Sequence, residues 1–269
     1  MRTIKLYVIW SIIYFPLNFL IICKDTKGIL HGLAGYIRSF LLTGSYTQLW
    51  YLNALIVAIC LIAILLKCKL KPETIFNCSC VLYALGLLGD SYYGLVIQNP
   101  LISKVLSAYN SIFITTRNGV FYGMFFSSMG MLLSKMNCSM LTKESAIGYI
   151  TSRFMMFFEV LILKTNNIAK DYNMFICAIP ATYFLFMWAK SFELKINLDY
   201  KKIRTISELI FLGHTWVRYV LNYLYQLANI DAVSSCLLYI STIIVSNLIA
   251  IVVIELSKHK AFKWLKRLY

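Results

Sequence analysis

Residues 49–66 read LWYLNALIVAICLIAILL, an apolar run that contains no charged side chain. The hydrocarbon core of a bilayer is about 30 Å thick, and an α-helix needs about 20 apolar residues to cross it. The whole chain has the same character, because 60% of its residues are hydrophobic and only 14% are charged. Soluble domains carry about 25% charged residues. The sequence therefore predicts an integral membrane protein.

Seven further segments resemble this run in length and apolar character. They are residues 6–23, 75–96, 119–133, 146–163, 172–189, 206–227 and 234–256. We predict an all-α fold, a polytopic transmembrane helix bundle of about eight spans that forms a single domain over residues 1–269. The segment 119–133 is short, so it either tilts unusually or takes residues 112–116 as its start. The second alternative gives a broken or re-entrant helix, which is tolerated only where protein or water covers the exposed backbone.

The basic residues predict the orientation. The chain has 26 Lys and Arg residues against 11 Asp and Glu residues. With the N-terminus in the cytoplasm, the inner segments carry 17 of the basic residues and the outer segments carry seven. Because cytoplasmic loops are enriched in Lys and Arg, we expect both termini in the cytoplasm. The basic tail 257–269 contains Phe262 and Trp264 and should lie along the inner leaflet.

The composition favours neither nucleic-acid binding nor metal binding. No basic run is interleaved with aromatic residues in the manner of a nucleic-acid groove, so we predict a lipid bilayer and no nucleic acid as a partner. Cys78 and Cys80 are too close together for a zinc knuckle, and no Cys or His set follows at ligand spacing. The eight cysteines are expected to be free thiols, and no metal is predicted.

Ionisable residues within membrane spans are costly and are functional candidates by default. His214 and Arg218 are four residues apart, so a helix places them on one face. The histidine could act as a base and the arginine could bind an anionic group. Alternatively, His214 bonds a neighbouring helix and Arg218 extends to the membrane surface.

Three more charged residues lie within predicted spans. Arg153 and Glu159 are six residues apart and fall on different faces, so we expect each to pair with another helix, in a structural ion pair or at a substrate. Asp90 either lines an outer vestibule or marks the end of its helix.

The segment TTRNGVFYG, residues 115–123, puts Arg117 and Asn118 at the outer mouth of a span. An arginine there can hold a carboxylate, phosphate or sugar oxygen, or contact lipid headgroups. Gly119 and Gly123 form a small-xxx-small pattern that lets another backbone approach closely.

Three stretches together resemble one family. KLYVIWSIIYFPL, YTQLWYLNALIVA and TTRNGVFYGMFFSSMGMLLSK occur in the order and spacing of the acyltransferase-three superfamily of bacterial membrane proteins. The chain is most similar to the branch that includes the membrane domain of vancomycin-resistance serine racemases, and LIFLGHTWVRY resembles a late helix of that family. The resemblance covers most of residues 1 to about 220.

The resemblance implies a multi-pass protein of the bacterial plasma membrane with about ten helices. It also implies transfer of an acyl group, usually acetyl, from acyl-CoA (acetyl-CoA) to a hydroxyl of a surface glycan or lipid-linked sugar. The family's catalytic arginine and histidine lie in a first helix that this sequence lacks, since Met1 falls where the third helix starts. Gln48 replaces a histidine of many relatives. We therefore expect a member that is truncated at its N-terminus, and that is either inactive or dependent on other residues for catalysis.

If catalysis occurs, a base must take the proton of the acceptor hydroxyl and donors must stabilise an oxyanion. We predict His214 and Arg117 as catalytic residues. The predicted substrate-binding residues are Arg218, Asn118, Trp50, Asp90, Arg153 and Glu159. Two further hypotheses stay open, a non-enzymatic membrane domain that carries a small polar substrate such as serine, and a lipid-linked glycan polymerase or flippase-like protein.

Overall fold

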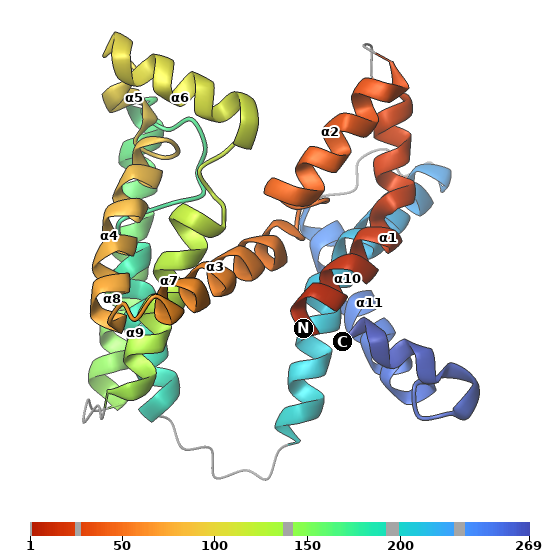
Figure 1. The fold of residues 1–269 in the computed structure, drawn as a ribbon. Helices are drawn as coiled ribbons and strands as arrows, with labels where there is room; N and C mark the ends of the chain where they lie inside the picture. The colour runs from red at the N-terminus through yellow and green to blue at the C-terminus, as the bar shows by residue number, and fades with distance from the viewer. Residues whose placement is uncertain (1, 25–27, 137–141, 192–198, 229–234) are drawn as a thin grey trace. The chain divides into compact units, whose positions relative to one another are not determined.

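The computed structural model describes residues 2–24, 28–136, 142–191, 199–228 and 235–269. All regular secondary structure in these residues is helical, so the predicted all-α class is confirmed for them (Figure 1). The helices in chain order are α1 (Arg2–Cys23), α2 (Ile29–Leu42), α3 (Trp50–Lys67), α4 (Pro72–Leu88), α5 (Tyr93–Val96), α6 (Pro100–Phe113), η1 (Gly119–Gly123), α7 (Met124–Lys135), α8 (Thr142–Thr165), α9 (Ala178–Ser191), α10 (Tyr200–Leu227), α11 (Ser235–Leu256) and η2 (Lys260–Leu268).

The chain divides into two compact units. The first unit comprises Met1–Ile37, Ser45–Leu49 and Ile196–Tyr269, and it contains α1, α10, α11 and η2. The second unit comprises Arg38–Gly44 and Trp50–Lys195, and it contains α3 to α9.

Four helices among the described residues, α1, α3, α8 and α11, are long and apolar enough to cross a membrane. This is fewer than the eight spans expected from the sequence. The other four expected segments also contain helices, α4, α7, α9 and α10, but these are shorter or more polar. The charged residues at the start of α10 and the early end of α4 at Leu88 account for part of the difference.

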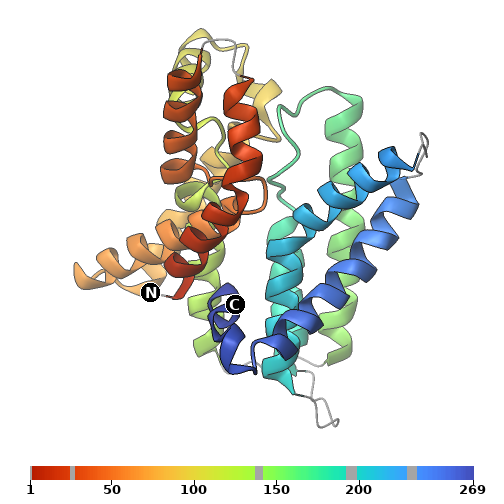
Figure 2. The same cartoon turned by 90° about the vertical axis from the view of Figure 1, so that its right-hand side faces the viewer.

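In the first unit, α1 packs on α10. Tyr14 of α1 is completely buried, and its hydroxyl donates to the carbonyl oxygen of Leu212 over 2.7 Å. In the reverse direction, the indole N–H of Trp216 donates to the carbonyl oxygen of Ile13 over 3.2 Å. Helices α10 and α11 lie side by side (Figure 2). These contacts hold the middle of α10 between two neighbours.

In the second unit, α3, α4, η1 and α7 pack around aromatic side chains. Tyr83 and Phe125 are almost completely buried, with ring centroids 4.6 Å apart. The predicted small-xxx-small contact is confirmed, because a Cβ atom at Gly119 would lie 2.4 Å from Val57 Cβ, and one at Gly123 would lie 2.8 Å from the carbonyl oxygen of Ala54. Only glycine allows α3 to lie this close.

Of the two alternatives for this segment, the structure has a helix break before it, although residues 112–116 are not its start. Helix α6 ends at Phe113, and Ile114 has a φ of +64°, which a β-branched residue rarely adopts. The chain resumes as the π-helix η1 at Gly119. Residues 112–113 therefore end α6 and do not begin the next helix, and a short connection of 114–118 carries Arg117 and Asn118.

Candidate functional site

Arg117 lies in a nest of polar and aromatic groups in the second unit. Its guanidinium carbon is 4.4 Å from the centroid of the Trp50 ring, a cation–π contact, and Nη1 donates to Oδ1 of Asn173 over 2.6 Å. Its Nε atom is buried and has no hydrogen-bond partner among the described residues. Burial lowers the pKa of the Arg117 guanidinium, and the negative charges of Asp90 and Asp171 act in the opposite direction. Arginine stays protonated under both influences.

Asp90 is completely buried and is held by backbone and side-chain donors. Its Oδ1 atom accepts from the backbone N–H groups of Asn173 and Met174 over 2.9 and 3.2 Å, and from the Ser91 hydroxyl over 3.0 Å. Its Oδ2 atom accepts from Nδ2 of Asn173 over 3.2 Å. Asn173 thus bridges Asp90 to Arg117. Asp90 lies just after α4 ends, so it marks the helix end and ties the connection before α9 to it.

Asn118 and Trp50 position the same segment. Asn118 Oδ1 accepts from the backbone N–H groups of Val120 and Phe121 over 2.9 and 3.2 Å and caps η1. Its Nδ2 group donates to the Tyr109 hydroxyl. Burial raises the pKa of Tyr109 to about 12, so this hydroxyl is neutral and accepts. Trp50 packs edge-on against the Tyr122 ring. With these partners, the amide of Asn118 serves local structure.

Glu159 and Arg153 do not pair with each other in the structure. Glu159 accepts from the Tyr92 hydroxyl over 2.7 Å and from the backbone N–H groups of Ile176 and Cys177 over 2.7 and 2.8 Å. It therefore satisfies donors at the entry of α9. Arg153 is exposed on α8, where Nη1 lies 3.6 Å from the sulfur of Met156.

His214 and Arg218 lie together in the first unit, along a groove between α10 and α11. The cavity has a volume of about 470 Å³. The α10 wall consists of Ile210, His214 and Arg218, which are spaced one turn apart, so the shared face predicted for the two polar residues is present. The α11 wall includes Thr242 and Ser246, and the buried Ser246 hydroxyl has no hydrogen-bond partner among the described residues.

The imidazole of His214 is oriented by its own helix. Its Nδ1 atom lies 2.9 Å from the carbonyl oxygen of Phe211 and 3.2 Å from that of Ile210. A carbonyl oxygen only accepts, so Nδ1 is the donor in these contacts. Nε2 lies 3.4 Å from the Thr215 hydroxyl, which donates to Oε1 of Gln48 over 3.0 Å. The groove is thus lined by an imidazole on a histidine and a fixed cation on an arginine.

Six of the eight predicted site residues fall into two groups. Arg117, Asn118, Trp50 and Asp90 form one cluster in the second unit, to which Glu159 and Arg153 do not belong. His214 and Arg218 form the groove in the first unit. The predicted roles of all these residues at a substrate stay predictions.

Two residues that matter for these sites are not predicted from the sequence. No charge pattern points to Asn173, and only its position in the polar run 170–173 distinguishes it. Ser246 is one serine in an apolar run, and its place in the groove follows from helix packing. Among the described residues, no three His, Cys, Asp or Glu side chains come together as metal ligands.

Comparison with known proteins finds relatives among racemases. Over 214 residues the chain is 25% identical to an amino-acid racemase of Enterococcus faecalis, a match that covers 79% of this chain and 30% of the relative. A second amino-acid racemase of Enterococcus faecalis is 29% identical over 209 residues, which cover 77% of this chain and 28% of the relative. A serine/alanine racemase of Enterococcus gallinarum is 27% identical over 185 residues, which cover 69% and 26%.

The chain is similar to part of these racemases. It spans less than a third of the length of the relatives it matches. The similarity is consistent with the predicted branch near the membrane domain of serine racemases. No family model matches the chain, and no solved structure matches it.

Proposed function

We propose that this chain is a membrane domain that binds a small neutral amino acid, such as serine or alanine, in the groove between α10 and α11. The relatives' names supply the substrate class, since one is a serine/alanine racemase and two are amino-acid racemases. The observation that carries the proposal is the groove itself, where His214, Arg218 and the unpartnered Ser246 hydroxyl line one cavity. Its volume is in the range of small-molecule sites.

The chemistry of the groove matches a zwitterion. Arg218 can form a two-pronged contact with a carboxylate, which is the geometry that guanidinium groups favour. The Nε2 lone pair of His214 can accept from an ammonium group, and the Ser246 hydroxyl can do the same. Apolar side chains such as Ile210 and Ile243 form much of the remaining wall, so a small side chain is accommodated without a further charge.

Acyl transfer from acyl-CoA to a glycan or lipid-linked sugar is less well supported by this groove. The lining of the groove contains one arginine and no lysine. Several cations are needed to bind the phosphate groups of coenzyme A. The residues that line the groove therefore do not fit acyl-CoA as the acyl donor. The imidazole of His214 could still take a proton from a hydroxyl, and this feature keeps a transfer reaction as a second candidate.

The proposed setting is the plasma membrane, with both ends of the chain on the cytoplasmic side. Four helices that could cross a membrane support a membrane protein. The excess of basic residues in the alternate connections supports the orientation. Eight spans would require α4, α7, α9 and α10 to cross as well.

Binding of radiolabelled serine to the purified chain in lipid nanodiscs tests the proposal. Arg218→Gln should weaken binding by roughly tenfold or more, since a hydrogen bond to a charged group contributes about 1.5–3 kcal/mol. Arg204→Gln is the matched control, because Arg204 is an exposed arginine of the same helix that does not line the groove. Serine affinity that is equal in the wild type and Arg218→Gln would contradict the proposal, as would saturable binding of acetyl-CoA at the same residues.

A further inference from the structure

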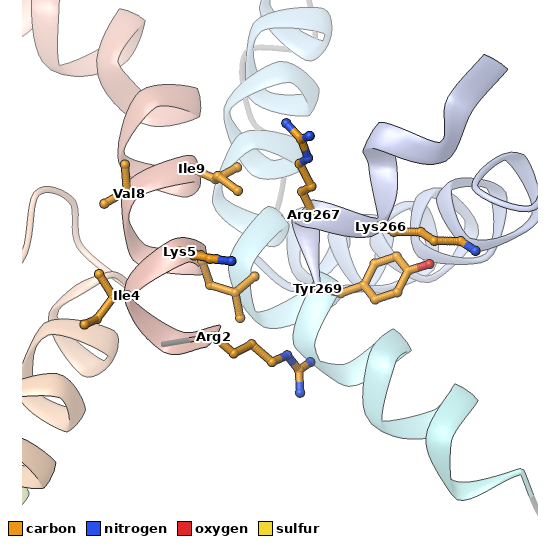
Figure 3. A pocket seen from close by; sticks show the side chains of 9 residues that line it. Arg2, Ile4, Lys5, Val8, Ile9, Lys266, Arg267 and Tyr269 are labelled. Carbon is orange, nitrogen blue, oxygen red and sulfur yellow. The ribbon is translucent and has the colours of Figure 1, made fainter. Parts of the chain in front are cut away.

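A second cavity in the first unit combines basic and apolar walls. It has a volume of about 730 Å³ and lies between the first turns of α1 and the tail around η2. Arg2 and Lys5 of α1 and Lys266 and Arg267 of the tail contribute four cationic side chains to its lining (Figure 3). It shares no lining residue with the groove between α10 and α11.

The tail is fixed against the helices, so this cavity is built into the fold. The indole N–H of Trp10 donates to the carbonyl oxygen of Leu268 over 3.0 Å. The hydroxyl groups of Ser257 and Tyr269 are 2.9 Å apart, which ties the tail to the end of α11. Leu265 is buried at 7% exposure. The cationic side chains of the tail are thus held next to α1.

Most of the positive charge at this cavity is not neutralised by the protein. Glu208 contacts Arg2 and also Arg204. Glu255 contacts Lys202 and Lys258 instead of the cavity. Among the described residues, Lys5, Lys266 and Arg267 are exposed and have no carboxylate within ion-pair distance. Figure 3 shows Lys5 reaching from α1 toward the tail. An anion placed here would gain attraction from several cations.

An apolar stripe leads away from the cavity along α1. Ile4 and Val8 line the cavity and are 47% and 40% exposed. Ile12, Phe15 and Phe19 continue the stripe at helical spacing and are also exposed. From residue 4 to residue 19 the helix rises about 22 Å. That distance exceeds one leaflet of a hydrocarbon core of about 30 Å.

We propose that this cavity binds the phosphate of an anionic phospholipid, whose acyl chain lies along the stripe on α1. The cations would bind the phosphate, and the apolar stripe would contact the acyl chain of the lipid. A soluble phosphate compound would leave the stripe unused. The exposed Phe262 and Trp264 of the tail are positioned to insert at the same membrane surface.

Binding of phosphatidylglycerol to the full chain, purified in an uncharged detergent, tests this inference by native mass spectrometry. The double variant Lys5→Gln/Arg267→Gln removes two cavity cations. Lys260→Gln/Lys263→Gln is the matched control, because it removes two cations from the same tail that do not line the cavity. The cavity variant loses two contacts to the phosphate and should bind more weakly, by roughly tenfold or more, whereas the control keeps these contacts and should match the wild type.

Three results would overturn the inference. Equal weakening in the two double variants would assign the effect to general surface charge. Equal affinity for phosphatidylcholine would remove the charge requirement. A third result has two parts. Inorganic phosphate or coenzyme A would displace the lipid, and short-chain phosphatidylglycerol would bind as tightly as the long-chain lipid. Together they would indicate a soluble phosphate ligand. If circular dichroism shows that the cavity variant is not helical, Lys5→Gln alone should still weaken binding several-fold, and unchanged binding would contradict the inference.

Discussion

At the scale of single residues, the structure distinguishes polar side chains that serve the fold from those that face a cavity. Asp90, Asn118 and Glu159 each accept hydrogen bonds from backbone N–H groups, and each orders a turn or a helix start. These side chains stabilise the fold, because a buried backbone N–H group without a hydrogen-bond partner costs free energy. His214 and Arg218 instead line a groove.

Replacing Asp90 tests the structural role. Asp90→Asn keeps the volume but puts an amide N–H group among four donors, so at least one contact is lost or becomes repulsive. We expect a loss of stability of about 1–3 kcal/mol. The measurement is thermal unfolding in detergent together with limited proteolysis of the connection 166–177, which should be cut faster. An unchanged melting temperature would show that Asp90 does not hold this connection.

Replacing Arg117 tests whether that cluster is a site or a support. Arg117→Ala removes the cation–π contact with Trp50 and the hydrogen bond to Asn173, so we expect a lower melting temperature. Because Arg117 does not line the α10–α11 groove, serine affinity should stay within about twofold of the wild type. A variant with normal stability that no longer binds serine would contradict this assignment and would support a role for Arg117 at the substrate.

The acceptor role of His214 gives a third test. His214→Ala removes the imidazole from the groove lining, whereas His214→Gln keeps a polar side chain there. We expect serine binding to weaken severalfold in the alanine variant, about 1 kcal/mol for one hydrogen bond, with partial recovery in the glutamine variant. Equal binding by all three proteins, measured by calorimetry, would remove His214 from the site.

At the scale of elements, the glycines of η1 explain how α3 and the π-helix pack. A Cβ atom at Gly119 would lie 2.4 Å from Val57 Cβ. Gly119→Ala should therefore destabilise the second unit by about 1–3 kcal/mol, the usual cost of overpacking. Gly130→Ala in α7 is the matched control, because nothing lies within 4 Å of its Cβ position, and alanine favours a helix. Equal melting temperatures for the two variants would contradict the close approach.

Sequence patterns predict some of these elements and miss others for physical reasons. Long apolar runs predict α1, α3, α8 and α11, because a run with few charges must be buried in protein or lipid. Helices α2 and α6 are missed because their apolar residues are interrupted by polar ones. The start of α6 is nonetheless signalled by Asn99 and Pro100, since Asn99 caps the helix and proline suits its first turn.

The sites are harder to predict than the helices. The spacing of His214 and Arg218 predicts a common face, and the structure has it. The partner helix α11 supplies Ser246 and Thr242, and no local pattern in the sequence shows which helix packs against α10. The contact of Arg117 with Asn173 joins residues 56 positions apart for the same reason.

At the scale of the whole molecule, charge predicts orientation. The basic tail, the cavity beside it and the cationic start of α1 all place positive charge at one end of α1 and α11 in the first unit. We expect a reporter fused after Tyr269 to be active only on the cytoplasmic side. Paired fusions of green fluorescent protein and alkaline phosphatase measure this, and phosphatase activity at that position would contradict the orientation.

The most direct test of the α10–α11 groove uses a diazirine-bearing amino acid of about the size of leucine. After illumination in nanodiscs, mass spectrometry locates the adducts on the chain. We predict adducts within residues 210–218 and 235–246, which are suppressed by excess serine and lost in Arg218→Gln. Adducts that serine suppresses but that lie only in the second unit, or groove adducts that serine does not suppress, would contradict amino-acid binding in this groove.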